Sequence, residues 1–330
     1  MRHVVLIGDG PKASVLGFGC SAIMGRVGRR QSLRALAAAY AAGVNFFDTA
    51  RSYGYGESET VVGEFLRGRR DRTVLSTKFG IVPVHQAPWK RALMPVVRTI
   101  VDNIPSARSI VRTQVKGQLR ENQITRAVLK NSLDESLRKL RTDYVDILFV
   151  HSAPISVLSQ IDLLEDLDRL VTAGKIRMAG ISSERDVVTA ALQSGQTILR
   201  AMQFPASLGD SSFMYKIAEA QPRRLVFVAN HPFGGVEGMT RLRSRLSELA
   251  ESPATPTEIR TRLKVQDEQI VPEIILNLIL ADTGIQVVIP SMMKLSHLRA
   301  NLDAVSSCRF TPGELEWIKC NLSPTRAPLA

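Results

Sequence analysis

Short apolar, β-branched runs alternate with longer amphipathic stretches along almost the whole chain. The short runs have the length of buried strands, and the longer stretches repeat their apolar residues at the helical period. Helices are predicted at residues 31–42, 57–67, 125–140, 163–173 and 187–194. Strands are predicted at residues 14–20, 44–48, 73–77, 144–150, 176–181, 198–203, 224–229 and 286–289.

Eight such units in a chain of 330 residues favour a closed (β/α)8 barrel, the TIM-barrel type of α/β fold, over an open doubly wound sheet. We therefore expect a single domain over residues 1–330, with a C-terminal tail at about 322–330. The N-terminal stretch Val4–Pro11 is expected to form a hairpin that plugs the bottom of the barrel. Its Gly-Asp-Gly lacks the third glycine of a dinucleotide-binding fingerprint.

Residues 81–123 interrupt the alternation after the third strand and are too long for a plain connection. A βα insertion sits over the barrel mouth, where we expect one or two short helices. Such an insertion could gate a substrate, or it could be an elaboration without a function of its own. Residues 231–265 form a second irregular segment, which is charged and prone to form helix. The basic residues of the first segment are Lys90, Arg91, Arg98, Arg108, Arg112, Lys116 and Arg120.

The formal net charge of +12 and the sequence pI near 10.0 allow a nucleic-acid partner, an anionic ligand or simply a basic proteome. Much of the excess lies in the basic insertion, where Trp89 is the one aromatic residue, and this argues against a base-stacking, nucleic-acid-binding surface. The sequence has neither a long uncharged apolar run nor a signal peptide at its start, so we expect a cytoplasmic protein without a membrane segment. Three cysteines without metal-ligand spacing predict no metal site.

Ionisable side chains end three of the predicted strands: Asp48, Lys78 and His151. Tyr53 follows Asp48 in a loop broken by glycines. Alone, each of these residues could be a cap or a loop anchor. Because the carboxyl ends of barrel strands meet at one mouth, we expect all four side chains to converge there.

Together these side chains suit proton transfer. An ammonium in contact with a phenol favours the phenolate, so Lys78 is expected to lower the pKa of Tyr53. Asp48 can keep Lys78 charged, and His151 can hydrogen-bond a substrate oxygen. None of them is a hydride source, so redox chemistry would need a bound cofactor. Residues 287–301 are predicted to form a strand, a turn and the start of a helix, where N–H groups and cations can hold a phosphate.

From Val15 to Asn301 the chain resembles the aldo-keto reductase superfamily. The resemblance implies a (β/α)8 barrel that interconverts carbonyls and alcohols with a nicotinamide cofactor. It matches Tyr53 to the family's general acid/base, and Asp48, Lys78 and His151 to the other members of a catalytic tetrad. The stretches that carry it, in the family's order, are residues 45–57, 75–80, 133–151 and 174–182.

The resemblance also implies a cofactor site. Ser182 and Gln203 match residues that bind the nicotinamide amide, with Ser183 beside them, and Asn230 stands where many members place a tyrosine against the ring. NADP(H) is favoured over NAD(H), because Lys294 can replace charge that NADPH-preferring members place elsewhere in this loop. The remaining matches are His231, Pro232, Phe233 and Gly234 over the pyrophosphate, and Pro290, Ser291, Lys294, His297 and Asn301 at the adenosine end.

Two functions are consistent with the predicted fold and site. The first is a nicotinamide-dependent oxidoreductase whose partner is a small aldehyde, ketone, sugar or alcohol. The alternative is a cofactor-binding regulatory subunit with a protein partner docked on the basic insertion, because the superfamily also resembles the β subunits of potassium channels. The sequence fixes neither the substrate nor the oligomeric state.

Overall fold

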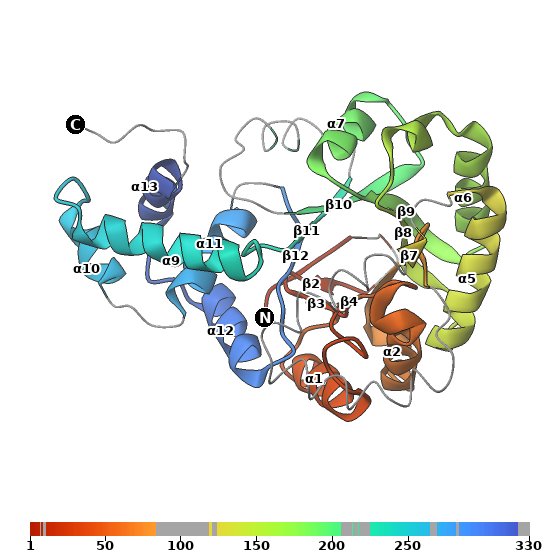
Figure 1. The fold of residues 1–330 in the computed structure, drawn as a ribbon, viewed down its shortest axis with the longest axis horizontal. Helices are drawn as coiled ribbons and strands as arrows, with labels where there is room; N and C mark the ends of the chain where they lie inside the picture. The colour runs from red at the N-terminus through yellow and green to blue at the C-terminus, as the bar shows by residue number, and fades with distance from the viewer. Residues whose placement is uncertain are drawn as a thin grey trace.

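The computed structural model describes residues 1–6, 8, 11–83, 119–120, 124–205, 213, 217, 225–264, 269–281 and 284–322. Eight parallel strands form one sheet in chain order (Figure 1). The backbone N–H of Val288 donates to the carbonyl of Val15 at 2.9 Å, which joins the last strand to the first and confirms the predicted barrel. The strands are β3 (Gly17–Gly19), β4 (Phe46–Asp48), β5 (Val74–Phe79), β8 (Val145–His151), β9 (Ile176–Ser182), β10 (Leu199–Pro205), β11 (Val226–Asn230) and β12 (Val287–Ile289).

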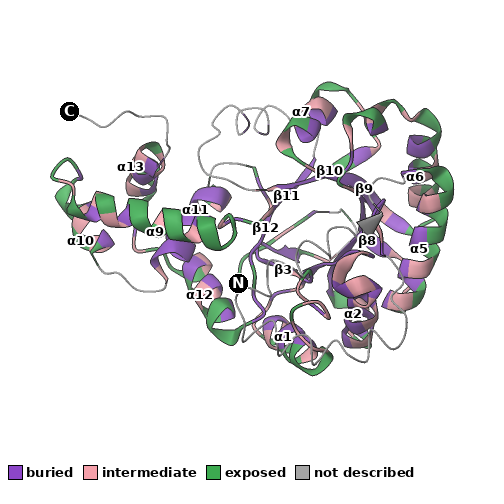
Figure 2. Ribbon diagram, in the orientation of Figure 1, coloured by how far each residue is buried: buried purple, intermediate pink, exposed green. Residues whose placement is uncertain are grey.

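Helices cover the outside of the barrel, with buried residues on the faces towards the strands and exposed residues on the outer faces (Figure 2). Those around the first six strands are α1 (Arg29–Ala41), α2 (Ser58–Leu66), α5 (Arg126–Leu140), α6 (Ile161–Thr172) and α7 (Arg185–Gln193). On the other side, α9 (Gly235–Glu251), α10 (Thr257–Leu263), α11 (Ile270–Ala281), α12 (Leu295–Ser306) and α13 (Pro312–Leu322) form a second group (Figure 1). None of the described helices is long and apolar enough to cross a membrane.

An N-terminal hairpin covers the bottom of the barrel. Its strands, β1 (His3–Val4) and β2 (Ala13–Ser14), pair antiparallel. Leu6, between them, is 8% exposed and belongs to the cluster of side chains that fills the barrel interior, which includes Phe46, Ile147 and Phe149. The predicted hairpin is therefore confirmed, and Leu6 is the side chain that closes this end.

The two ends of the basic insertion lie side by side. Strand β6 (Val82–Pro83) pairs antiparallel with β7 (Leu119–Arg120), so the chain leaves and re-enters the barrel at one place. The short helices expected within the insertion lie outside the described residues, as does the predicted tail beyond Leu322.

Candidate active site

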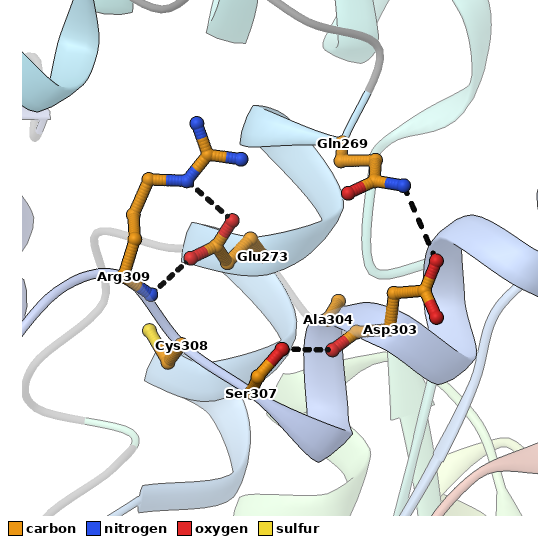
Figure 3. A pocket seen from close by; sticks show the side chains of 7 residues that line it. All are labelled: Gln269, Glu273, Asp303, Ala304, Ser307, Cys308 and Arg309. Atoms are coloured by element: carbon orange, nitrogen blue, oxygen red, sulfur yellow. Dashed lines mark hydrogen bonds and ion pairs between the residues drawn. The ribbon is translucent and has the colours of Figure 1, made fainter.

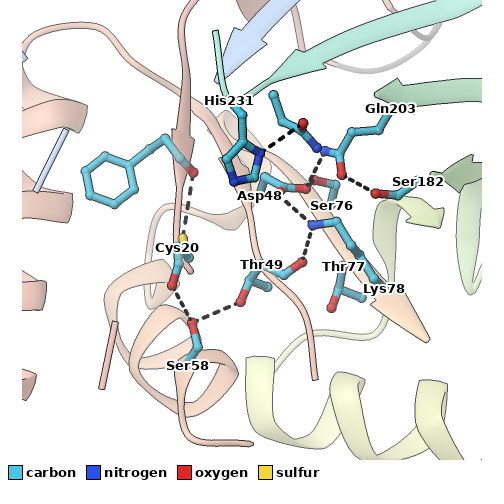
Figure 4. Close-up of polar contacts among 12 residues, drawn as sticks. Cys20, Asp48, Thr49, Ser58, Ser76, Thr77, Lys78, Ser182, Gln203 and His231 are labelled. Atoms are coloured by element: carbon cyan, nitrogen blue, oxygen red, sulfur yellow. Dashed lines mark hydrogen bonds and ion pairs between the residues drawn. The ribbon is translucent and has the colours of Figure 1, made fainter. Parts of the chain in front are cut away.

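A buried ion pair lies at the carboxyl ends of β4 and β5. The Nζ of Lys78 is 2.6 Å from Oδ2 of Asp48 and donates to the carbonyl of Thr49 at 3.0 Å (Figure 4). Lys78 is only 2% exposed. Burial lowers the pKa of Lys78, but the interactions with Asp48 and Tyr53 together outweigh burial, so the pKa lies above its ordinary value and the ammonium stays charged.

Tyr53 reaches this pair from a tight turn. Its backbone N–H donates to the carbonyl of Ala50 at 3.1 Å and starts the short 3-10 helix η1 (Tyr53–Gly56). Gly54 has φ 58°, and a Cβ there would lie 2.2 Å from the carbonyl oxygen of Ile23. The turn therefore needs glycine at this position. It brings the Tyr53 ring centre to 4.9 Å from the Nζ of Lys78, so the predicted contact is present.

The net effect on the Tyr53 phenol is opposite to the predicted one. Burial raises its pKa, Lys78 lowers it, and the Asp48 charge raises it again, with a net increase above the ordinary value. The ammonium is visible in the sequence, but the desolvation of the phenolate, which opposes it, depends on burial in the folded chain. At neutral pH the phenol consequently holds its proton, and Lys78 offsets part of the cost of releasing it.

His151, the last residue of β8, faces Tyr53. The two rings pack edge to face with centroids 5.9 Å apart. Burial, together with the Lys78 charge, lowers the pKa of His151 from 6.5 to about 3, so the imidazole is neutral at physiological pH. Its Nδ1 is buried and has no hydrogen-bond partner among the described residues.

Ser182 and Gln203 extend the polar chain away from Asp48. They are register partners at the ends of β9 and β10. The hydroxyl of Ser182 donates to Oε1 of Gln203 at 2.6 Å, and Nε2 of Gln203 donates to Oδ1 of Asp48 at 3.0 Å (Figure 4). Ser183, by contrast, donates its hydroxyl to the carbonyl of Ala153 at 2.7 Å and so fastens the loop after β8. The structure thus brings two of these three residues to the tetrad.

The loop after β11 links the barrel to α9. Asn230 ends the strand, and its Oδ1 lies 3.1 Å from Nδ1 of His231, which is exposed and has φ 48°. Pro232 is buried, and Phe233 packs against the outer core. Gly234 has φ 63° and begins α9. The loop therefore has a defined conformation next to the mouth.

The loop after β12 is the neighbour of this one, because Asn230 is in register with Ile289. Asn301 is 2% exposed, and its Nδ2 lies 3.5 Å from the carbonyl of Ser291. Asn301 therefore braces the loop from α12. Lys294 precedes the first turn of α12 and is exposed. Of the other predicted residues here, Pro290 is buried, whereas Ser291 and His297 are exposed.

One member of the polar chain was missed in the sequence. The hydroxyl of Ser76 donates to Oδ1 of Asp48 at 2.7 Å. Ser76 precedes Lys78 by two residues on β5, so the alternation of a strand places both side chains on the same face. That spacing was a usable signal.

A cavity of about 260 Å³ lies elsewhere, between α11, α12 and the segment before α13 (Figure 3). Its main charged groups are already paired, because Nε of Arg309 contacts Oε2 of Glu273 at 2.8 Å. Nε2 of Gln269 donates to Oδ2 of Asp303 at 3.2 Å. These contacts join the helices and do not involve the tetrad. No cluster of three or more potential metal ligands occurs among the residues that the structure describes.

Comparison with known proteins assigns most of the chain to one family. The model of the aldo/keto reductase family matches residues 15–319. An aryl-alcohol dehydrogenase, NADP(+), of Phanerodontia chrysosporium is 32% identical over 161 residues, which are 48% of this chain and 36% of that protein. The aldo-keto reductase YhdN of Bacillus subtilis is 29% identical over 189 residues, 56% of this chain and 47% of that protein. The matched part thus spans less than half the length of these curated relatives.

Solved structures match over the whole barrel. An aldo-keto reductase from Bacillus halodurans in its holo form superimposes with a TM-score of 0.68 and 22% identity, covering 98% of this chain and 97% of that one. An aldo/keto reductase from Klebsiella pneumoniae, solved with NADP and acetate, has a TM-score of 0.67 and 23% identity, with coverage of 99% and 98%. These likenesses establish the fold.

Proposed function

Since the chain belongs to the aldo/keto reductase family, we propose that it is a nicotinamide-dependent oxidoreductase that interconverts a small carbonyl compound and its alcohol. The observation that carries the proposal is the buried Asp48–Lys78 pair beside Tyr53. A fixed charge beside a protonated phenol is suited to moving one proton to and from an oxygen atom.

We assign the proton to Tyr53. In the reductive direction the phenol gives its proton to the carbonyl oxygen, and Lys78 stabilises the phenolate that remains. Asp48 holds the ammonium in place through the 2.6 Å contact. The neutral His151 hydrogen-bonds the same substrate oxygen and orients it. When bound, a nicotinamide cofactor would supply the hydride to the carbonyl carbon in reduction and accept it from the alcohol carbon in oxidation.

The residues at the mouth fit such a cofactor. Ser182 and Gln203 offer adjacent hydroxyl and amide groups, which match the donor and acceptor of a carboxamide. The unpaired Nδ1 of His151 supports this proposal, because a buried polar atom ordinarily has a hydrogen-bond partner and this one has none among the described residues. At the far end, we propose that the first N–H groups of α12 and the exposed Lys294 hold phosphate.

We favour NADP(H) over NAD(H). Lys294 is exposed at the start of α12, and Arg299 follows on the same helix, so two cations are available for a 2′-phosphate. The relative from Phanerodontia chrysosporium is named for NADP(+), and the Klebsiella pneumoniae structure contains NADP, which supports the same preference.

The test uses wild type and Tyr53→Phe. Each protein is titrated with NADPH and NADH by fluorescence, then assayed with the tighter cofactor against a panel of aldehydes, ketones and sugars. We expect wild type to turn over and Tyr53→Phe to lose about 100- to 10,000-fold in kcat, with cofactor Kd nearly unchanged. Substantial residual activity in the variant would refute the role of Tyr53. Tight cofactor binding by a wild type that turns over nothing would favour the regulatory alternative.

A further inference from the structure

Arg51 lies between Asp48 and Tyr53 in the chain, but its side chain contacts α5. The guanidinium donates to Oγ of Ser132 at 2.7 Å and pairs with the carboxylate of Glu135. The Arg51 side chain is 8% exposed, so this ion pair is largely shielded from solvent. One flank of the Tyr53 turn is therefore held against α5.

The other flank is held by the same helix. Nζ of Lys139 donates to the carbonyl of Gly56, the last residue of η1, at 2.8 Å. The same ammonium lies 3.0 Å from Oε1 of Glu135. Glu135 thus contacts both cations, one on each side of Tyr53. We call Arg51, Glu135 and Lys139 the α5 clamp.

Close packing of the α2 and α5 backbones fixes the position of the α5 clamp. A Cβ at Gly63 of α2 would lie 2.3 Å from the carbonyl oxygen of Lys139, so the two helices touch at this glycine. Nearby, Oγ1 of Thr77 donates to Oε1 of the fully buried Glu59 at 2.7 Å. Thr77 adjoins Lys78, so the same helix pair also supports the strand that carries the lysine.

Glu135 is charged at neutral pH. Burial raises the pKa of its carboxyl group, but the hydrogen bond from Lys139 and the charge of Arg51 outweigh burial, and the pKa lies below its ordinary value. Replacing Glu135 by glutamine therefore removes one charge from between two cations while nearly preserving the shape of the side chain.

We propose that Glu135 is a positioning residue for Tyr53: through Arg51 and Lys139 it fixes both sides of the turn that places the phenol beside Lys78. The inference rests on the proposed function for its kinetic consequence and on the contacts alone for its structural one. Misplacement of a reacting group by about 1 Å costs up to roughly 100-fold in rate, so a loosened turn should reduce kcat without changing the cofactor site.

The test compares Glu135→Gln with Asp134→Asn in the full chain. Asp134 is the adjacent residue on α5 and forms an exposed ion pair with Lys175 at 3.3 Å, so this control also removes one carboxylate and one pair. We expect kcat to fall about 10- to 100-fold in Glu135→Gln, with the Kd of NADPH within about twofold of wild type. Asp134→Asn should match wild type. Lys139→Arg, which retains the cation, should keep most of the activity.

A second measurement does not depend on turnover. The chain has five tyrosines, so ¹³Cζ-tyrosine labelling gives a spectrum in which Tyr53 is assigned from its loss in Tyr53→Phe. The Tyr53 line should shift or broaden in Glu135→Gln and stay in place in Asp134→Asn. The line of Tyr144, whose ring contacts the guanidinium groups of Arg70 and Arg177, should remain unchanged and so report an intact fold.

The kcat values and the Tyr53 line together distinguish a failure of the α5 clamp from a failure of the proposed function. An unchanged Tyr53 line and unchanged kcat in Glu135→Gln would overturn the α5 clamp. A shifted line in a protein whose wild type turns over no carbonyl compound would support the α5 clamp and refute the proposed function. Loss of both the Tyr144 and Tyr53 lines would show that Glu135 serves the whole fold, which also overturns the proposal.

Discussion

Burial shifts the pKa of Lys78, Tyr53 and His151, and the charge of Lys78 opposes burial at Tyr53 but reinforces it at His151. At Lys78 the contacts with Asp48 and Tyr53 together outweigh desolvation, whereas at Tyr53 and His151 desolvation dominates. The result is a charged lysine next to a neutral phenol and a neutral imidazole. Such a set can hydrogen-bond a neutral substrate and develops new charge only when the proton moves.

His151 should make the stability of the protein depend on pH. Its pKa is about 3 in the folded chain and 6.5 ordinarily, so between these values the unfolded chain binds a proton that the folded chain excludes. The stabilising contribution is present above pH 6.5 and is lost as the pH falls towards 3. From pH 7 to pH 5 this costs up to about 2 kcal/mol.

The measurement is urea unfolding of wild type and His151→Gln at pH 7 and pH 5. Glutamine does not titrate, so the variant should lose up to about 2 kcal/mol less than wild type over this interval. Equal losses in the two proteins would mean that the histidine takes up its proton in the folded state.

At the scale of helices and strands, the sequence predicts which elements exist better than it predicts which elements contact one another. Each barrel strand is a β-branched run between turn residues, and all eight are found. The first strand is nevertheless shorter than predicted, because Ser14 belongs to β2 of the N-terminal hairpin and pairs with His3 instead. Helix α11 was not predicted, because it is apolar on almost every face and shows no helical period.

The residues of the site likewise include some that the sequence reveals and one that only the packing reveals. Asp48, Lys78 and His151 are recognisable because they end predicted strands, and Tyr53 because it follows Asp48 in a loop broken by glycines. Glu135 is not, because its partner Arg51 is 84 residues away in the chain and only the packing of α2 on α5 brings the two together.

Gly63 tests how tightly α2 and α5 pack. Alanine within a helix is ordinarily more stable than glycine by up to about 1 kcal/mol. At Gly63, however, a Cβ would lie 2.3 Å from the carbonyl oxygen of Lys139 and 2.7 Å from the backbone of Leu140, atoms that cannot rotate away. We expect Gly63→Ala to lower the free energy of unfolding by about 1–3 kcal/mol.

Gly313 is the matched control, because it lies in α13 and a Cβ there meets no atom within 4 Å. In urea denaturation, Gly313→Ala should be neutral or slightly stabilising. If Gly63→Ala behaved like Gly313→Ala, the two helices would be farther apart than the structure has them.

At the scale of the whole molecule, the barrel has two differently constructed ends. Polar side chains occupy the mouth, where Asp48, Lys78 and Gln203 are linked by hydrogen bonds. The opposite end is apolar and is covered by the N-terminal hairpin. Function can therefore be concentrated at one end, while the other contributes mainly to stability.

Leu6 should carry much of that stability. Its side chain is 8% exposed and packs into the cluster that fills the barrel, whereas the adjacent Val5 is 59% exposed. Leu6→Ala should reduce the free energy of unfolding by about 2–3 kcal/mol, because it removes buried methyl groups and leaves a cavity. Val5→Ala should change it by less than about 0.5 kcal/mol. Urea denaturation of both variants measures the difference, and activity assayed well below the unfolding transition should be unaffected in either. Equal stabilities would mean that the hairpin lies on the barrel without contributing to its core.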